Sequence, residues 1–230
     1  MITLYTISIR NNTVCILILT LHVVNEAVTS CSVMLDFSAF NYCSVIDLPE
    51  DYEVYDFSKS YDPHRTLKSP YGIGKYNEQR PSMYTHEQYQ NERNIHMGID
   101  IAAPVGTEIK SFFDGKIFAF ANNSQPGDYG FTVVVEHELQ EKKLYALYGH
   151  LSERSLTSKV IGQKIQQGEV FAWVGDKHEN GGWNPHLHFQ LSWVKPEGAD
   201  MPGVVSRANH KWALETFPDP QLVLGKLYEN

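Results

Sequence analysis

The feature of this 230-residue chain that most constrains its fold is a series of short apolar runs separated by glycines, between residues 96 and 195. β-Branched and aromatic residues dominate these runs, which occupy 131–137 (FTVVVEH), 144–151 (LYALYGHL), 170–174 (VFAWV) and 187–194 (LHFQLSWV). A further run at 109–120 alternates around Asp114–Gly115, a sequence typical of a hairpin. Short strands with Gly-rich turns are typical of an all-β sandwich. We therefore expect a mainly β fold, an antiparallel β-sheet sandwich with few helices.

Composition and charge exclude several classes of protein. Apolar residues make up 42% of the chain, which is enough for a hydrophobic core. The net charge is -8, with 19 basic against 27 acidic residues and no long Lys/Arg run, whereas nucleic-acid binding depends on neutralising phosphates. No stretch approaches the ~20 apolar residues of a membrane span. We expect neither nucleic-acid binding nor a membrane span.

The chain divides by composition into four segments. We expect an N-terminal extension at 1–34, a loop-rich segment at 35–93, a strand-rich domain at 94–195 and a C-terminal extension at 196–230. The second segment is punctuated by prolines and lacks helical periodicity, so it should pack on its neighbour. Within it, residues 71–80 (YGIGKYNEQR) have too few apolar side chains to pack alone. They are either a plain surface connection or, as we expect, a loop that folds onto the strand-rich domain and borders its groove.

An apolar run near the N-terminus has the length of a signal-peptide core. It covers residues 14–24 (VCILILTLHVV), with Arg10 before it and small residues suited to cleavage at 28–31 (VTSC). The latter also loosely resemble a bacterial lipoprotein box. An export signal would place the protein in the cell envelope or outside the cell, whereas a buried strand or plain extension would leave it cytoplasmic. An odd number of cysteines, all in the first fifth of the chain, allows at most one bridge: Cys15, Cys31 and Cys43.

The first of two candidate metal-binding motifs is HMGID at residues 96–100. On a single strand, alternate side chains share a face, which places His96 and Asp100 together with the gap of Gly98 between them. The opposite, apolar face is then made by Met97, Ile99 and Ile101. Zinc binds His nitrogen and Asp oxygen at ~2.0–2.2 Å, so the polar face is a candidate half of a metal site.

The second motif is His186-Leu187-His188, in which period two places both imidazoles on one face. Either motif alone is a weak signal, because two ordinary polar residues explain it equally well. Together, two histidines and Asp100 supply three protein ligands and leave a fourth position for water, the open pattern of catalytic zinc. His150, in YGHLS, adds a histidine from a different strand end. Histidines surplus to the three ligands suit general acid/base work, since their pKa lies near neutrality.

At this point the chain resembles a known family. In order, the segments HMGIDIAAPVGTEI, DGKI, GDYG, YALYGHLS, GQKIQQGEVFAWVGD and PHLHFQL are similar to lysostaphin/LytM-type zinc metallopeptidases. The likeness covers roughly residues 94–195. It implies a β-sheet sandwich with a groove above one Zn²⁺ ion. Within the family pattern, zinc is bound by His96, Asp100 and His188, and the further active-site histidines are His150 and His186.

Two parts of the sequence qualify this resemblance. Two segments that flank residues 94–195 are more weakly similar to a bacterial subgroup of this family, whose members are sometimes fused to other enzyme domains: YGIGKYNEQR and FPDPQLVLG. Residues 180–185 (NGGWNP) and Gln190, where many members have glutamate, depart from the family pattern. These positions border the groove in the family and so bear on cleavage specificity.

The resemblance implies a zinc-dependent metalloendopeptidase that hydrolyses peptide bonds, above all in the cross-links or stem peptides of bacterial peptidoglycan. One alternative is a non-hydrolytic module that binds and activates another cell-wall hydrolase, although the retained ligands argue against it. A weaker one is a small-molecule amidase with the same metal chemistry. Four neighbouring side chains have simpler expectations. We expect a structural role for His137, and core packing for Tyr148 with donation to the metal site as its alternative. Trp183 is either a core residue or a substrate-stacking wall. Tyr129, in GDYG, belongs to a turn, with a role in the groove as its alternative.

Overall fold

A computed structural model describes residues 7–9, 12–14, 35–62, 68–89 and 92–229. The chain forms two units, residues 1–34 and 35–230. In the first unit, two strands pair antiparallel: β1 (Ile7–Ile9) and β2 (Asn12–Val14). Except for Val14, the expected export segment lies outside the described residues, as do Cys15 and Cys31. The expectations for export and for a bridge therefore stay predictions.

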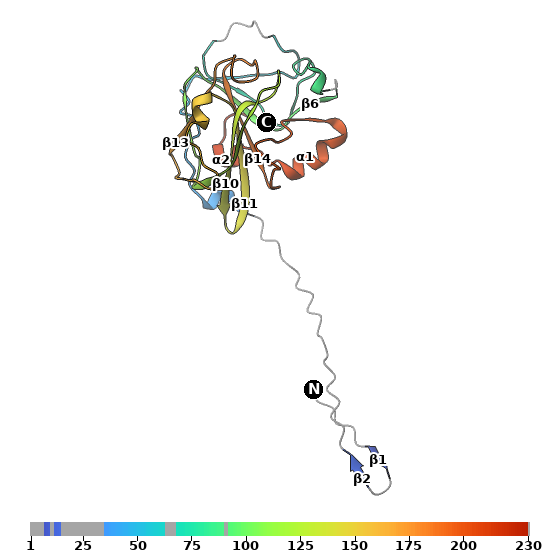
Figure 1. Cartoon of the computed structure of the whole chain (residues 1–230). Helices are drawn as coiled ribbons and strands as arrows, with labels where there is room; N and C mark the ends of the chain where they lie inside the picture. Colours follow the sequence, from blue (N-terminus) through green and yellow to red (C-terminus); the bar gives the residue numbers. More distant parts are fainter. Residues whose placement is uncertain (1–6, 10–11, 15–34, 63–67, 90–91, 230) are drawn as a thin grey trace. The chain divides into compact units, whose positions relative to one another are not determined.

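An eight-stranded sheet forms the centre of the second unit (Figure 1). In spatial order its strands are β12 (Lys164–Ile165), β9 (Gly115–Asn123), β10 (Gly130–Leu139), β11 (Lys142–Leu151), β14 (His186–Ser192), β7 (Ile99–Ala102), β4 (Gly72–Gly74) and β3 (Glu53–Val54). Neighbouring strands are antiparallel, except that β3 and β4 are parallel. The strands predicted at 131–137, 144–151 and 187–194 are confirmed as β10, β11 and β14.

Two smaller antiparallel sheets accompany the central one. The first pairs β8 (Glu108–Lys110) with β13 (Val170–Trp173), which confirms the run predicted at 170–174. The second has the order β15 (Val204–Ser206), β6 (Arg93–His96) and β5 (Glu78–Gln79). Helices are short: α1 (His210–Thr216), α2 (Gln221–Leu224), and the 3-10 turns η1 (Phe37–Ala39), η2 (Glu87–Tyr89), η3 (Glu153–Leu156) and η4 (Arg207–Asn209). None of the described helices is long and apolar enough to cross a bilayer.

The central sheet is buried on both faces because its strands alternate between two hydrophobic clusters. Along β10, Val133 and Val135 join the cluster that includes Phe171 of β13, whereas Val134 joins the cluster that includes Ile95 of β6 and Ala213 of α1. Strands covered on both faces are near-continuously apolar, as FTVVV and LYALY are in this sequence. The expected mainly β sandwich with few helices is confirmed.

Residues 71–80 fold onto the strand-rich part of the chain. β4 pairs with β7 and places Gly74 opposite Asp100. Ile73 is fully buried in the core, and Arg80 lines the cleft described below. The expectation that this segment borders the groove is confirmed, and the alternative of a plain surface connection is wrong.

The expectation of a single strand through the HMGID motif is wrong. β6 ends at His96 and β7 begins at Ile99, and the two strands belong to different sheets. Met97 accordingly packs in one cluster and Ile99 in the other, although both are buried as expected. The chain turns at Gly98, where a Cβ atom would lie 2.6 Å from the His188 ring. The turn therefore depends on glycine, which lets the backbone pass close to that imidazole.

The hairpin expected around Asp114–Gly115 is also wrong. β8 pairs with β13, whereas β9 pairs with β10 and β12, so the two halves of the 109–120 run lie in different sheets. The link between them buries Phe112 completely in the first cluster. The Asp114 carboxylate accepts a hydrogen bond from the Gln167 amide rather than closing a hairpin. Burial of Phe112 between the sheets thus outweighs the local turn preference.

His137 ends the β10 run as a buried core residue, as expected. Its ring packs on Phe112 with centroids 4.2 Å apart, and its Nδ1 donates to the Asp114 carbonyl at 3.0 Å. Burial lowers the pKa of His137 to about 4, against the ordinary value of ~6.5. Between those values the unfolded chain binds the extra proton. Stability is therefore complete above pH 6.5 and decreases as the pH falls toward 4.

Between pH 6.5 and pH 4.5 we expect this one histidine to lower the free energy of unfolding by about 2–3 kcal/mol, at ~1.4 kcal/mol for each pH unit. Urea unfolding of the zinc-free protein at pH 7 and pH 4.5 measures the loss. In a His137→Gln protein, the free energy of unfolding should fall less over this interval than in the parent. An equal fall in both proteins would contradict the assignment.

Candidate metal centre

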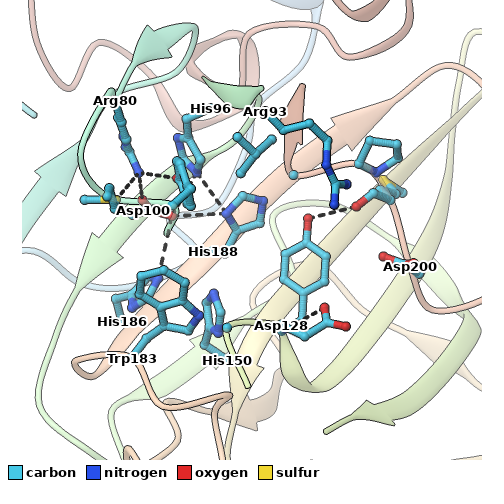
Figure 2. A pocket seen from close by; sticks show the side chains of 18 of the residues that line it. Arg80, Arg93, His96, Asp100, Asp128, His150, Trp183, His186, His188 and Asp200 are labelled. Atoms are coloured by element: carbon cyan, nitrogen blue, oxygen red, sulfur yellow. Dashed lines mark hydrogen bonds and ion pairs between the residues drawn. The ribbon is translucent and has the colours of Figure 1, made fainter. Parts of the chain in front are cut away.

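The five predicted site residues converge on one cleft of about 1130 Å³ (Figure 2). They come from separate strands: His96 ends β6, Asp100 lies on β7, His150 lies near the end of β11, and His186 and His188 lie on β14. Strand register brings them together, because His188 pairs with Asp100 on one side and with Gly149 on the other. Leu187 and Phe189 point into the core from the opposite face of β14.

Three of these side chains place one atom each at the corners of a small triangle. His96 Nε2 lies 3.0 Å from His188 Nδ1, and each of these nitrogens lies 3.1 Å from Asp100 Oδ1. A tetrahedral zinc ion with bonds of ~2.0–2.1 Å holds its ligand atoms about 3.3 Å apart. The triangle therefore has the size and the donor types that zinc requires, and this group could hold a metal ion.

The outer nitrogens of the two imidazoles determine what the inner ones can do. His96 Nδ1 lies 3.0 Å from the Lys75 carbonyl, and His188 Nε2 lies 3.0 Å from Gln190 Oε1. Carbonyl oxygens only accept hydrogen bonds, so both outer nitrogens carry hydrogen, and in the neutral form of each ring the inner nitrogen presents a lone pair. Gln190 is oriented by its own amide group, which donates to the Pro202 carbonyl at 3.3 Å. Three lone pairs thus face one another at the triangle, an arrangement that a bound cation stabilises.

Charges around the triangle keep these groups in their ligand forms. Burial, followed by the positive charge of Arg80, lowers the pKa of His96 to about 4, so this imidazole is neutral near pH 7. Burial would raise the pKa of Asp100, but His96 and the Arg80 guanidinium outweigh it and hold the pKa well below the usual value. Arg80 Nη1 donates to Asp100 Oδ2 at 2.6 Å, which leaves Oδ1 for the triangle. Metal binding requires neutral histidine and ionised aspartate, and these are the forms that His96 and Asp100 take here.

His150 and His186 lie beside the triangle with their rings 4.3 Å apart. His150 Nδ1 donates to the Asn180 carbonyl at 2.8 Å and His186 Nδ1 donates to the Asn184 carbonyl at 2.6 Å, which leaves an Nε2 lone pair on each. Burial lowers the pKa of both imidazoles, that of His150 well below its usual value. Both are therefore neutral near pH 7, and each can accept a proton at Nε2.

The aromatic residues near the cleft have different roles. Trp183 lines it, with its ring 6.1 Å from that of Tyr84, and so forms a wall. Tyr148 is fully buried in the core, as expected. Tyr129 lines the cleft and packs on His188 with ring centroids 5.1 Å apart, but its hydroxyl donates to the Met201 carbonyl at 2.9 Å. That hydroxyl is therefore engaged in holding the 201–203 segment beside the site.

Three residues that the sequence pattern did not single out as site residues hold the site together. Arg80 binds Asp100, Gln190 binds His188, and Asn180 accepts the hydrogen bond of His150. The Asn180 side chain also accepts from the amides of Gly182 and Trp183, which shapes the loop before β14. Gln190 and the 180–185 loop stood out only as departures from the family pattern. Arg80 had no signal beyond its place in a polar loop.

The His–Asp–His group could hold a metal ion, and comparisons with known proteins point to a family of peptidases. Residues 94–200 match the model of Peptidase family M23. The DD-carboxypeptidase/endopeptidase Mpg of Neisseria meningitidis is 35% identical over 96 residues, which are 42% of this chain and 20% of that protein. The murein hydrolase activator EnvC of Escherichia coli is 32% identical over 126 residues, 54% of this chain and 27% of EnvC. The matched regions thus span only a fifth to a quarter of these curated relatives.

Solved structures similar to this chain include two catalytic domains. The catalytic domain of lysostaphin from Staphylococcus simulans has a TM-score of 0.45 and 22% identity, covering 68% of this chain and 93% of that one. A mutant catalytic domain of the prophage-encoded M23 protein EnpA from Enterococcus faecalis has a TM-score of 0.42 and 26% identity, covering 59% of this chain and 91% of that one.

Proposed function

We propose that this protein is a zinc-dependent metalloendopeptidase that hydrolyses peptide bonds in bacterial peptidoglycan, in its cross-links or stem peptides. The observation that carries the proposal is the triangle of three lone pairs beside two neutral histidines in an open cleft. The substrate class is supported by the relatives, among them Mpg and the peptidoglycan DD-endopeptidase ShyB of Vibrio cholerae, which is 33% identical over 96 residues.

In this proposal His96, Asp100 and His188 hold the zinc ion. Bound there, zinc would polarise the scissile carbonyl and make a water molecule more acidic. His150 takes a proton at Nε2 from the attacking water, because its Nδ1 is committed to the Asn180 carbonyl. That proton then passes to the leaving amine, directly or through His186, whose ring lies 4.3 Å from that of His150 and whose Nδ1 is held by the Asn184 carbonyl. While His186 carries it, the Nε2 hydrogen can donate to the developing oxyanion. Trp183 forms a wall along which the substrate chain lies.

The second candidate function is a non-hydrolytic module that activates another cell-wall hydrolase. The match to the activator EnvC favours it, since that match covers more of this chain than the match to Mpg. Retention of every metal-ligating and proton-accepting side chain favours hydrolysis, because an activator has no need for neutral imidazoles with free lone pairs around a metal site. Turnover separates the two functions.

We expect the purified full chain to carry about one zinc ion and to release new amino termini from purified peptidoglycan. A chelator should abolish release, and added Zn²⁺ should restore it. Zinc content is measured by atomic absorption and amino termini by amine labelling. Zinc binding without release, combined with stimulation of a separate wall hydrolase, would replace the proposal with the activator function. Mass analysis of fragments from defined wall peptides then identifies the bond.

A further inference from the structure

Arg80 places a buried positive charge beside the triangle, and this residue lies outside the matched family segment. Arg80 is 1% exposed and lies 14 residues before the start of the match at residue 94. Figure 2 shows its side chain directed at Asp100 from the side of the triangle opposite Trp183 and His150. A buried guanidinium is stable only where its N–H donors are matched by acceptors, so its hydrogen-bond partners show which groups it orients.

Each nitrogen of the Arg80 guanidinium has an acceptor. Nη1 donates to Asp100 Oδ2 at 2.6 Å and to the Tyr84 hydroxyl at 3.0 Å. Nε donates to Glu78 Oε2 at 2.9 Å, and Nη2 donates to the Lys75 carbonyl at 3.2 Å. Glu78 is itself held by the Phe57 amide, which donates to its Oε1 at 2.9 Å. The guanidinium is therefore fixed in position by its surroundings rather than free to follow Asp100.

This network reaches two of the three predicted ligands. It fixes the orientation of Asp100 by binding Oδ2, so that Oδ1 is directed at the triangle. The Lys75 carbonyl also accepts from His96 Nδ1 at 3.0 Å, so one oxygen anchors both Arg80 and His96. The backbone leaves room for this: at Gly74 a Cβ atom would lie 2.8 Å from Arg80 Nη2 and 3.1 Å from Asp100 Oδ2.

We propose that Arg80 is a positioning residue for the metal site, and that residues 74–80 supply groups that orient its ligands. The inference rests on the proposed zinc-binding function. Arg80 places a positive charge near the ion, which by itself disfavours a cation. Glu78, on the same guanidinium, offsets that charge, and the gain is an aspartate held in its ligand orientation before the metal arrives. Removing this partner should weaken zinc binding about 10- to 100-fold, the usual range for groups that orient ligands.

The test measures zinc affinity by competition with a chromogenic chelator in the full chain. Arg80→Gln alone leaves both Glu78 and Asp100 without their cation, so the main variant is the double change Glu78→Gln with Arg80→Gln. This change removes one buried carboxylate together with the guanidinium and leaves the Asp100 carboxylate for the metal. Arg93→Gln is the matched control. Arg93 lines the same cleft but contacts the Tyr89 ring and the Gln88 carbonyl instead of a ligand. Thermal unfolding of each zinc-free protein reports its stability separately.

We expect the double variant to bind zinc 10- to 100-fold more weakly and the Arg93→Gln protein to match the parent. Arg80→Lys, which keeps the charge but not the planar fork, should be intermediate, and it is the deciding variant if the neutral one does not fold. A folded double variant, or in its place a folded Arg80→Lys protein, with the parent's zinc affinity would overturn the inference while leaving the proposed function intact. A parent chain that binds no zinc would refute the proposed function itself.

Discussion

Replacing His188 with alanine should remove the bound zinc and reduce peptide hydrolysis by at least about 10³-fold. The magnitude follows from the several kcal/mol of transition-state stabilisation that a catalytic metal supplies, at ~1.4 kcal/mol for each factor of ten. The same outcome is expected for His96→Ala and Asp100→Ala, because three protein ligands are the minimum for a catalytic zinc site. Atomic absorption and the rate of amino-terminus release, measured on the same preparations, test both losses together.

His178→Ala is the matched control for these variants. Its side chain is 78% exposed and pairs only loosely with Asp176 at 3.6 Å, so its loss should change neither zinc content nor rate. The zinc-free variants should remain folded, because the sheet around the site is buried on both faces independently of the triangle. Full zinc occupancy in any one of the three ligand variants would remove that residue from the assignment.

Much of the fold could be predicted from the sequence because burial on both faces makes a strand apolar along its whole length. The runs that became β10, β11 and β14 are of this kind. The two incorrect expectations, at 96–101 and 109–120, have a common cause. In both, a locally regular pattern spans a place where the chain passes from one sheet to another, which only the packing of Met97 or Phe112 determines.

The candidate site was predictable to the extent that its side chains lie in short motifs. His186 and His188 are two residues apart on one strand, and His96 and Asp100 are close in the chain even though they lie on different strands. Two of the groups that orient them, the Lys75 carbonyl and the Arg80 guanidinium, are 21 and 20 residues away from their partners in sequence. Lys75 contributes only its carbonyl to His96, so its side-chain identity carries no signal. Such contacts depend on the register between β4 and β7, which no local pattern specifies.

His150 is the residue whose replacement should separate catalysis from metal binding. It lies beside the triangle without belonging to it, with its ring 4.3 Å from that of His186 and its Nδ1 bound to the Asn180 carbonyl. A His150→Ala protein should keep its zinc and lose ~10²–10⁴-fold in rate, the usual contribution of one positioned acid/base group. His186→Ala should also lose rate, and because His186 Nε2 lies 3.7 Å from Asp100 Oδ1 its zinc affinity should be measured beside the rate.

The backbone at His150 decides which variant tests this most sharply. Its φ angle is +61°, in the left-handed region, where alanine costs roughly 1–2 kcal/mol and asparagine is better tolerated. His150→Asn therefore removes the imidazole with less backbone strain and serves as the partner of His150→Ala. We expect both proteins to hold one zinc ion, to unfold at temperatures within several degrees of each other, and to show the same loss of rate. If His150 only hydrogen-bonds the loop before β14, both variants will retain near-normal turnover, and His186 will remain as the proton carrier.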